Sequence, residues 1–305
     1  MPRLTFSYLN AWRSLILALG LVSIVGCKTT SGDKAGAPKE NLLPDFQVKE
    51  KTSSGLVFVQ GELSSGCEPR HSPITALILH HTAGNLVGSY DALLGKNKHH
   101  LVGVHYLVTD EPQPRVIRMV PESMAAFHAG HSGWRQLDNL NQSSIGIEIV
   151  NLDGNVHPYS NAQRDVVLKL CKDILRRNPG IKATEVLAHS DIAVGRKVDP
   201  GSLFPWSYFA SQGVGVWPST NDVVEALKNG SNVSPTEMRQ NLERYGYHLE
   251  ATDAGLKLGI EAFQRHFRPS RVDGIADAET MAILKALLKR NSPSLPIPAK
   301  NSPKA

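Results

Sequence analysis

Several common catalytic signatures are absent from this sequence. It contains no HExxH motif of zincin metalloproteases, no GxSxG elbow of serine hydrolases and no Walker loop for phosphate binding. The apolar run SLILALGLVSIV near the N-terminus is too short for a membrane-spanning helix, which needs about 20 apolar residues. Lys and Arg are scattered rather than clustered, so the net charge of +5 indicates no nucleic-acid partner.

Cysteine is also scarce, with three residues in 305. Cys67 and Cys171 are too few for a disulfide framework, although they could pair in an oxidising compartment. Cys171 falls on the apolar face of an expected helix, which favours a buried free thiol over a disulfide. A cysteine peptidase built on Cys67 and His71 is disfavoured, because cysteine and histidine adjacent in sequence rarely form a catalytic pair.

The N-terminus has the pattern of a secretory signal. Arg3 and Arg13 precede the apolar run, which ends at Gly26 and Cys27. The residues IVGC resemble a lipobox, which implies cleavage after residue 26 and lipidation of Cys27. By the same resemblance, Lys28 favours the outer membrane of a Gram-negative cell. An uncleaved membrane anchor is the alternative interpretation. Residues 27–51, rich in Lys, Gly, Ser and Pro, are expected to form a flexible tether.

Residues 52–213 alternate between strand-like and helix-like segments. Short apolar or β-branched runs at 75–80, 103–109, 115–120 and 144–150 are typical of strands. Residues 161–178 predict an amphipathic helix, with Ser160 and Gln163 as a capping box and Pro179 after its end. The sequence therefore predicts an α/β domain, with a central β-sheet buried on both faces.

Glu148 is unexpected within the apolar run SIGIEIV. Ile145, Ile147 and Ile149 would point to one face of the strand, and Glu148 to the other. A carboxylate in such a strand loses hydration, so it needs a hydrogen-bonding or ionic partner or serves a catalytic role. Glu148 is therefore a candidate catalytic acid or base, and an exposed face of an edge strand is the alternative.

His80 ends the apolar run TALILH, so its ring is expected at the mouth of the sheet. Catalytic zinc commonly takes three protein ligands, chosen from histidine nitrogen and carboxylate oxygen, and leaves a fourth position open. His80, His189 and Asp199 could supply these ligands from separate parts of the chain. The sequence thus allows a zinc site that no single local motif encodes.

Three segments in order, ILHHTAG, SIGIEIV and HSDIAVGRKVDPG, resemble the type-2 N-acetylmuramoyl-L-alanine amidases. This family is related to phage lysozyme-type amidases and to peptidoglycan recognition proteins. The resemblance implies a mixed central β-sheet flanked by helices and hydrolysis of the amide between N-acetylmuramic acid and L-alanine. The implied substrate is peptidoglycan or muropeptides, and no protein partner is predicted.

The resemblance also assigns roles to individual residues. It implies one Zn²⁺ per chain held by His80, His189 and Asp199, with Glu148 as the catalytic carboxylate and Lys197 as the cation that stabilises the transition state. In an extended segment, Lys197 and Asp199 would point the same way. A structural pairing of His189 with Asp199 and a solvated Lys197 are the alternatives.

Further residues near these motifs are less sharply defined. His105, His128 and Trp134 are expected to line the substrate cleft, with core packing as the alternative. Asp191 is expected to shape the loop through local backbone hydrogen bonds. His81 is left out of the metal site because its position varies in the family.

Beyond an expected linker at 214–232, residues 233–290 carry three helical signals. The stretch IEAFQRHF...VDGIADAETMAIL resembles the small all-α, three-helix peptidoglycan-binding domain. A helical cap that only stabilises the catalytic domain is the alternative. The Pro-rich segment 291–305 is expected to be disordered. Together these features predict a lipid-anchored zinc amidase facing the periplasm, with a non-catalytic peptidoglycan-recognition protein as the main alternative.

Overall fold

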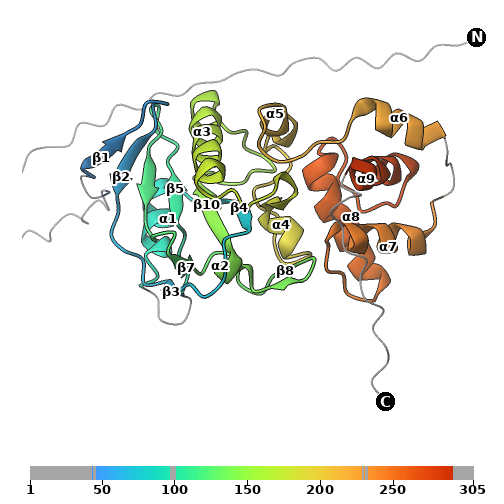
Figure 1. Cartoon of the computed structure of the whole chain (residues 1–305), viewed down its shortest axis with the longest axis horizontal. Coiled ribbons are helices and arrows are strands. Elements are labelled where there is room, and N and C mark those ends of the chain that lie inside the picture. Colours follow the sequence, from blue (N-terminus) through green and yellow to red (C-terminus); the bar gives the residue numbers. More distant parts are fainter. Residues whose placement is uncertain (1–42, 44–45, 97–100, 229, 231–232, 291–305) are drawn as a thin grey trace, which may run out of the picture. The chain divides into compact units, whose positions relative to one another are not determined.

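The structure is a computed structural model, and it describes residues 43, 46–96, 101–228, 230 and 233–290 (Figure 1). The expected signal peptide at 1–26, the lipidation site Cys27 and the expected tail at 291–305 lie outside the described residues. Within the described part of the chain, no helix is both long and apolar enough to cross a bilayer.

The regular elements follow one another along the chain. The strands are β1 (Val48–Lys51), β2 (Val57–Gln60), β3 (Cys67–Pro69), β4 (Ala76–His81), β5 (Tyr106–Val108), β6 (Val116–Arg118), β7 (Met124–Ala126), β8 (Gly133–Trp134), β9 (Leu137–Asp138), β10 (Ser144–Ile149) and β11 (Val186–Ala188). The helices are α1 (Leu86–Leu93), α2 (Leu140–Ser143), α3 (Asn161–Arg177), α4 (His189–Ile192), α5 (Trp206–Ser211), α6 (Thr220–Lys228), α7 (Pro235–Tyr245), α8 (Asp253–Phe267) and α9 (Ala278–Arg290).

A mixed seven-stranded sheet, in the order β1-β2-β6-β5-β10-β4-β11, organises the first part of the described chain. β10 is parallel to both of its neighbours, β4 and β5, and β11 is parallel to β4. The four strands predicted from the sequence are confirmed as β4, β5, β6 and β10. β10 is an interior strand, which removes the alternative that Glu148 lies on an edge strand.

The two faces of the sheet bury different clusters. Ile145, Ile147 and Ile149 pack with the apolar stripe of α3 in one core, as their alternation predicts. On the other face, α1 packs over β2, β5 and β6.

The predicted capping box at α3 forms only in part. Ser160 accepts a hydrogen bond from the Gln163 N–H, but the Gln163 side chain instead donates to the carbonyls of Thr109 and Val150. The side chain of Gln163 therefore ties α3 to the sheet rather than closing the cap.

The C-terminal helices share a core with the sheet domain. Ile78, Leu187 and Ile192 belong to the same buried cluster as residues of α7, α8 and α9. The helix α8 turns an apolar stripe towards this core, because Leu256, Ile260, Phe263 and Phe267 are all buried. The segment expected to be a linker, 214–232, contains the helix α6, which packs against α9.

The expected tether, 27–51, ends earlier in the structure than the sequence predicts. Phe46 is buried, and its ring lies edge-on to Tyr90 with centroids 5.1 Å apart. β1 then pairs antiparallel with β2. The polar composition of the segment predicts a tether throughout, but the side chain of Phe46 anchors its last residues to the sheet.

Candidate functional site

Three parallel strands bring the candidate residues to one edge of the sheet. His80 lies near the carboxyl end of β4, and Glu148 faces it in register on the adjacent strand β10. His189 directly follows β11, the other neighbour of β4, and begins α4. Because carboxyl ends of parallel strands meet at one edge, side chains more than 100 residues apart in sequence converge there.

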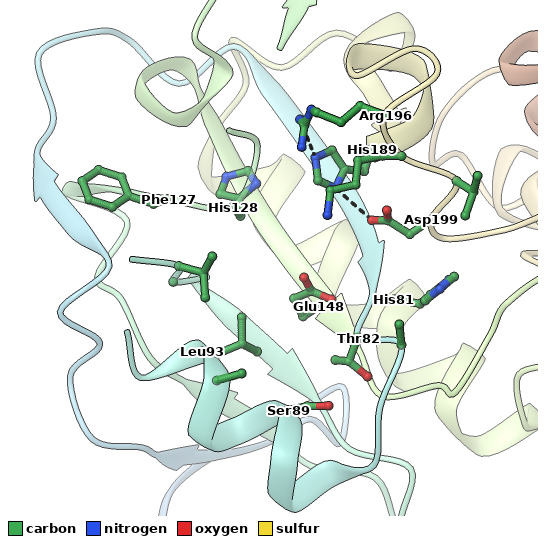
Figure 2. A pocket seen from close by; sticks show the side chains of 16 residues that line it. His81, Thr82, Ser89, Leu93, Phe127, His128, Glu148, His189, Arg196 and Asp199 are labelled. Carbon is green, nitrogen blue, oxygen red and sulfur yellow. Dashed lines mark hydrogen bonds and ion pairs between the residues drawn. The ribbon is translucent and has the colours of Figure 1, made fainter. Parts of the chain in front are cut away.

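The side chains of His80, His189 and Asp199 form a close triangle. Their atoms His80 Nδ1, His189 Nδ1 and Asp199 Oδ2 are separated by 2.9 Å between the histidines and by 3.1 and 3.0 Å to the carboxylate. All three residues are buried. Figure 2 shows the ion pair between His189 and Asp199 at the wall of a cavity. The structure thus brings together the three residues that the sequence suggests as metal ligands.

This donor set fits a bound cation better than it fits hydrogen bonding alone. The two Nδ1 atoms lie 2.9 Å apart, and both lie about 3 Å from one carboxylate oxygen. Hydrogen bonds cannot satisfy all three atoms at once, because protons on both Nδ1 atoms would face each other. The centre of the triangle is about 1.7 Å from each corner, which is less than a typical zinc–nitrogen distance of about 2.0–2.1 Å. His80, His189 and Asp199 are therefore close enough together that they could hold one zinc ion.

The outer nitrogens of both histidines have partners that favour this arrangement. His189 Nε2 lies 3.1 Å from the Ala129 carbonyl, which accepts its proton and leaves Nδ1 as a lone-pair donor. His80 Nε2 lies 3.0 Å from His128 Nδ1, and His128 Nε2 lies 3.3 Å from Ser144 Oγ. Burial, with a smaller contribution from His189, lowers the pKa of His80 to about 4. His80 is therefore neutral at physiological pH, as a metal ligand must be.

Asp199 lies in the loop after α4, where backbone and side-chain contacts hold it. Its carbonyl accepts a hydrogen bond from the Ser190 N–H. Although burial alone would raise it, the pKa of the Asp199 carboxyl is held well below its usual value by His189 and His80. Asp191, as predicted, shapes this segment locally, because its carboxylate accepts a hydrogen bond from the Ala188 N–H at 2.8 Å.

Arg196 is also part of this site, although no pattern in the sequence assigns it a role. Its Nη2 donates to the carbonyls of Ala129 and His131 and lies 3.4 Å from His189 Nε2. The guanidinium thereby joins the loop of Asp199 to the segment that contacts His189. The only sequence signal was its place beside Lys197 in the GRK triplet.

Glu148 is well suited to proton transfer. Its Oε2 is buried and has no hydrogen-bond partner within the described structure, and Glu148 is one of the residues that line the cavity. Burial, and then repulsion from Asp199, raises the pKa of Glu148 well above its usual value, and Lys197 opposes this shift. A cation bound beside it would oppose the shift further. The carboxyl therefore holds a proton more readily than an exposed glutamate does.

The cavity in front of these residues has a volume of about 380 Å³. Figure 2 shows Glu148 on its floor, with Ser89 and Leu93 of α1 on one side and Arg196 on another. Lys197, His81, His128 and Phe127 also line it. A concave site with an apolar wall and a few convergent polar groups is the usual form of a small-ligand site.

Of the three residues expected in the cleft, only His128 lines this cavity. His105 is fully buried, and its Nδ1 accepts a hydrogen bond from the Gly146 N–H. Trp134 is fully buried as well, and it packs edge-on against Tyr245 and Tyr247. The core-packing alternative therefore applies to His105 and Trp134, because neither has surface that a ligand could reach.

The cysteines contribute nothing to this cavity. Cys67 and Cys171 are both free thiols, as the favoured interpretation of the sequence has it, and they do not pair. The Cys67 thiol donates to the Ser64 carbonyl, and burial raises its pKa, which disfavours the reactive thiolate. His71 is exposed, and within the described residues no hydrogen bond joins it to Cys67.

Comparison with known proteins identifies relatives of both parts of the chain. Residues 70–202 match the family described as N-acetylmuramoyl-L-alanine amidase, and residues 231–284 match the family described as peptidoglycan binding domain. The N-acetylmuramoyl-L-alanine amidase AmiD of Escherichia coli is 40% identical over 234 residues, which cover 71% of this chain and 83% of that protein.

Two solved structures are similar in fold over most of their length. One is the complex of Escherichia coli AmiD with the substrate anhydro-N-acetylmuramic acid-L-Ala-D-gamma-Glu-L-Lys, with a TM-score of 0.66 and 38% identity, covering 73% of this chain and 92% of that one. The other is AmpDh3 from Pseudomonas aeruginosa in complex with anhydromuramic pentapeptide, with a TM-score of 0.67 and 35% identity, covering 73% and 94%.

Proposed function

The chain belongs to the N-acetylmuramoyl-L-alanine amidase family, and from this we propose that it uses zinc to hydrolyse the bond between N-acetylmuramic acid and L-alanine. The close triangle of His80, His189 and Asp199 carries the metal assignment. A recognition protein without activity would need to lack part of this set, whereas the chain has all three residues.

Zinc held by His80, His189 and Asp199 would lower the pKa of a bound water toward about 7 and polarise the scissile carbonyl. His80 and His189 contribute neutral nitrogens, and Asp199 contributes one negative charge. This donor set leaves the bound ion a net positive charge, which suits attack on an unreactive amide. The other nitrogens of both histidines are already engaged, so the ligands are held in orientation before substrate binds.

Glu148 acts as the general base and acid in this proposal. It accepts the proton of the attacking water and passes it to the nitrogen of L-alanine, because an amine leaves far more readily than an amide anion. The raised pKa of Glu148 supports both halves of this task. Lys197 lines the same cavity and stabilises the negative charge that develops on the carbonyl oxygen.

The proposed substrates are muropeptides and peptidoglycan. Both solved relatives hold ligands with an anhydromuramic sugar, and we extend this substrate class to the present chain. We assign catalysis to a domain at 52–213 and wall binding to the helical region at 233–290, which matches the peptidoglycan binding domain family. His128 faces the cavity and is the proposed contact for the substrate among the three residues expected there.

We also propose that the mature protein is an outer-membrane lipoprotein that faces the periplasm. The lipobox-like IVGC and the polar segment after Cys27 support this location. The unmodified protein is expected to incorporate a labelled fatty acid in the host cell, and Cys27→Ala is expected to abolish that labelling. Absence of label in the unmodified protein, with the protein in the membrane fraction, would support an uncleaved anchor instead.

The test of the activity uses the protein without residues 1–27 and purified muropeptides with either intact or anhydro sugars. Free stem peptide is followed by mass spectrometry with a chelator, without it, and after zinc is restored. We expect release that stops on chelation and returns with zinc. Binding without release under every condition would identify a recognition protein and refute the proposal.

A further inference from the structure

A buried carboxylate joins the zinc-ligand helix to the C-terminal helices. Asp191 lies in α4, two residues after His189, and is fully buried. Its Oδ1 accepts a hydrogen bond from the Tyr247 hydroxyl at 2.7 Å, and its Oδ2 lies 2.7 Å from His266 Nδ1. Tyr247 and His266 both belong to the region that matches the peptidoglycan binding domain family. The two units thus meet through polar contacts directly behind His189.

Both partners of Asp191 are themselves held firmly. The His266 ring stacks on Trp206 with centroids 3.9 Å apart. The Tyr247 ring lies 5.1 Å from Trp134, and the backbones of these two residues form an isolated β-bridge. The side chains that reach Asp191 therefore have fixed positions, and they can transmit the position of the C-terminal region to α4.

A second contact reaches the loop that follows α4. Gly195 has a φ of +73°, and a Cβ atom there would meet Leu258 Cδ1 of α8 at 2.7 Å. Ile192 and Ala193 belong to the apolar cluster shared with α7, α8 and α9. The C-terminal helices therefore cover α4 and the start of the segment that continues to Lys197 and Asp199.

The length of α4 makes these contacts important. A helix of four residues has no stability of its own, because helix nucleation is unfavourable and is offset only over longer segments. Its position must come from tertiary contacts, and metal ligands tolerate errors of only about 0.5 Å. Asp191 is a fully buried polar group, so it also needs these hydrogen-bond partners.

We propose that the C-terminal helical region, besides any role in wall binding, is a structural part of the metal centre. His266 and Tyr247 are positioning residues: through Asp191 they hold α4 so that His189 Nδ1 faces His80 and Asp199. This inference rests on the proposed zinc function, and it adds that residues outside the matched amidase segment set the zinc affinity.

The experiment measures zinc affinity of the full chain by competition with a chromogenic chelator. His266→Ala is expected to weaken zinc binding several-fold, less than the 10- to 100-fold typical when a direct partner of a ligand is removed, because His266 acts through Asp191. His266→Asn keeps an N–H donor near the position of Nδ1 and is expected to restore most of the affinity. Tyr247→Phe removes one hydroxyl only and is expected to weaken binding by a smaller factor.

Leu287→Ala is the matched control, because Leu287 is fully buried in α9 within the same apolar cluster but has no hydrogen bond to Asp191. It is expected to lower the melting temperature without changing the zinc affinity. The visible spectrum of the cobalt-loaded protein gives a second readout, and we expect it to change in His266→Ala but not in Leu287→Ala.

Unchanged zinc affinity in both His266→Ala and Tyr247→Phe would overturn the inference, and so would an equal loss in the Leu287→Ala control. Should His266→Ala fail to fold, Tyr247→Phe and His266→Asn still decide the matter. Failure of the unmodified protein to bind zinc would instead refute the proposed function, and it is seen before any variant is compared.

Discussion

Replacing Glu148 by glutamine separates catalysis from folding at this site. Glutamine keeps the shape of the side chain but cannot accept and release a proton. Because general acid–base catalysis contributes about 10²- to 10⁴-fold, we expect Glu148→Gln to lower kcat by a factor in this range. Glu148 is not one of the three atoms of the metal triangle, so zinc affinity should be unchanged.

The same substitution is expected to stabilise the metal-free protein at neutral pH. Burial raises the pKa of Glu148 above its ordinary value of 4.5, so above that pH the folded state binds more protons than the unfolded state. The wild-type protein therefore loses stability as pH rises from 4.5 toward the pKa of the folded state, whereas glutamine does not titrate. The difference in free energy of unfolding between Glu148→Gln and the wild-type protein should vanish below pH 4.5 and grow as the pH rises above it.

The assay combines stem-peptide release with melting temperatures measured in a chelator between pH 4 and pH 8. Glu185→Gln is the control, because Glu185 is also buried but accepts a hydrogen bond from Trp134 Nε1 and pairs with Arg135. It should destabilise the protein and leave kcat unchanged. A Glu148→Gln protein that keeps more than a tenth of its kcat would refute the catalytic role. A lower melting temperature at pH 7 would refute the electrostatic reasoning.

Four further changes test the remaining assignments. Asp199→Ala removes one of the proposed ligands and should weaken zinc binding, measured by chelator competition, by more than the 10- to 100-fold typical of outer partners. His128→Ala removes the acceptor 3.0 Å from His80 Nε2 and should weaken zinc binding about 10- to 100-fold. Lys197→Ala should lower kcat about 10²- to 10³-fold in steady-state kinetics while zinc binding stays intact. Alkylation of Cys67 should leave peptide release unchanged, since neither Cys67 nor Cys171 lines the cavity; inhibition would reopen the cysteine-peptidase alternative.

The sequence could predict the central strands because their pattern is local. The alternation of Ile145, Ile147 and Ile149 with Glu148 is a period-2 signal, and the structure places the isoleucines in the core with α3. The sequence did not predict strands β1, β2, β3, β7, β8, β9 and β11, which have two to four residues each. Strands β5 and β6 are equally short, but they fall within the longer apolar runs at 103–109 and 115–120 and were therefore predicted. The predicted capping role of the Gln163 side chain was wrong, because this side chain donates instead to the carbonyls of Thr109 and Val150. These partners are remote from the helix start in sequence, so a local capping pattern does not reveal them.

The errors at the site arose where burial depends on distant partners. Trp134 occurs in a His- and Gly-rich segment that looks like a cleft wall, yet Tyr245 and Tyr247 cover it from more than 100 positions away. Arg196 was overlooked because its partners are backbone carbonyls of residues 129 and 131, which leave no trace in the sequence. Contacts between remote segments are invisible to any local pattern.

The two halves of the site are fixed by different means. His80 and Glu148 face each other in register on adjacent parallel strands, so the ladder spacing of about 4.8 Å sets their separation. His189 and Asp199 come from a four-residue helix and a loop, which side-chain contacts to Asp191 and from Arg196 hold in place. A substitution beside His80 or Glu148 must disturb the sheet before it moves them. A substitution among the side chains around α4 can shift His189 while the sheet stays intact, so metal affinity should be more sensitive there than overall stability.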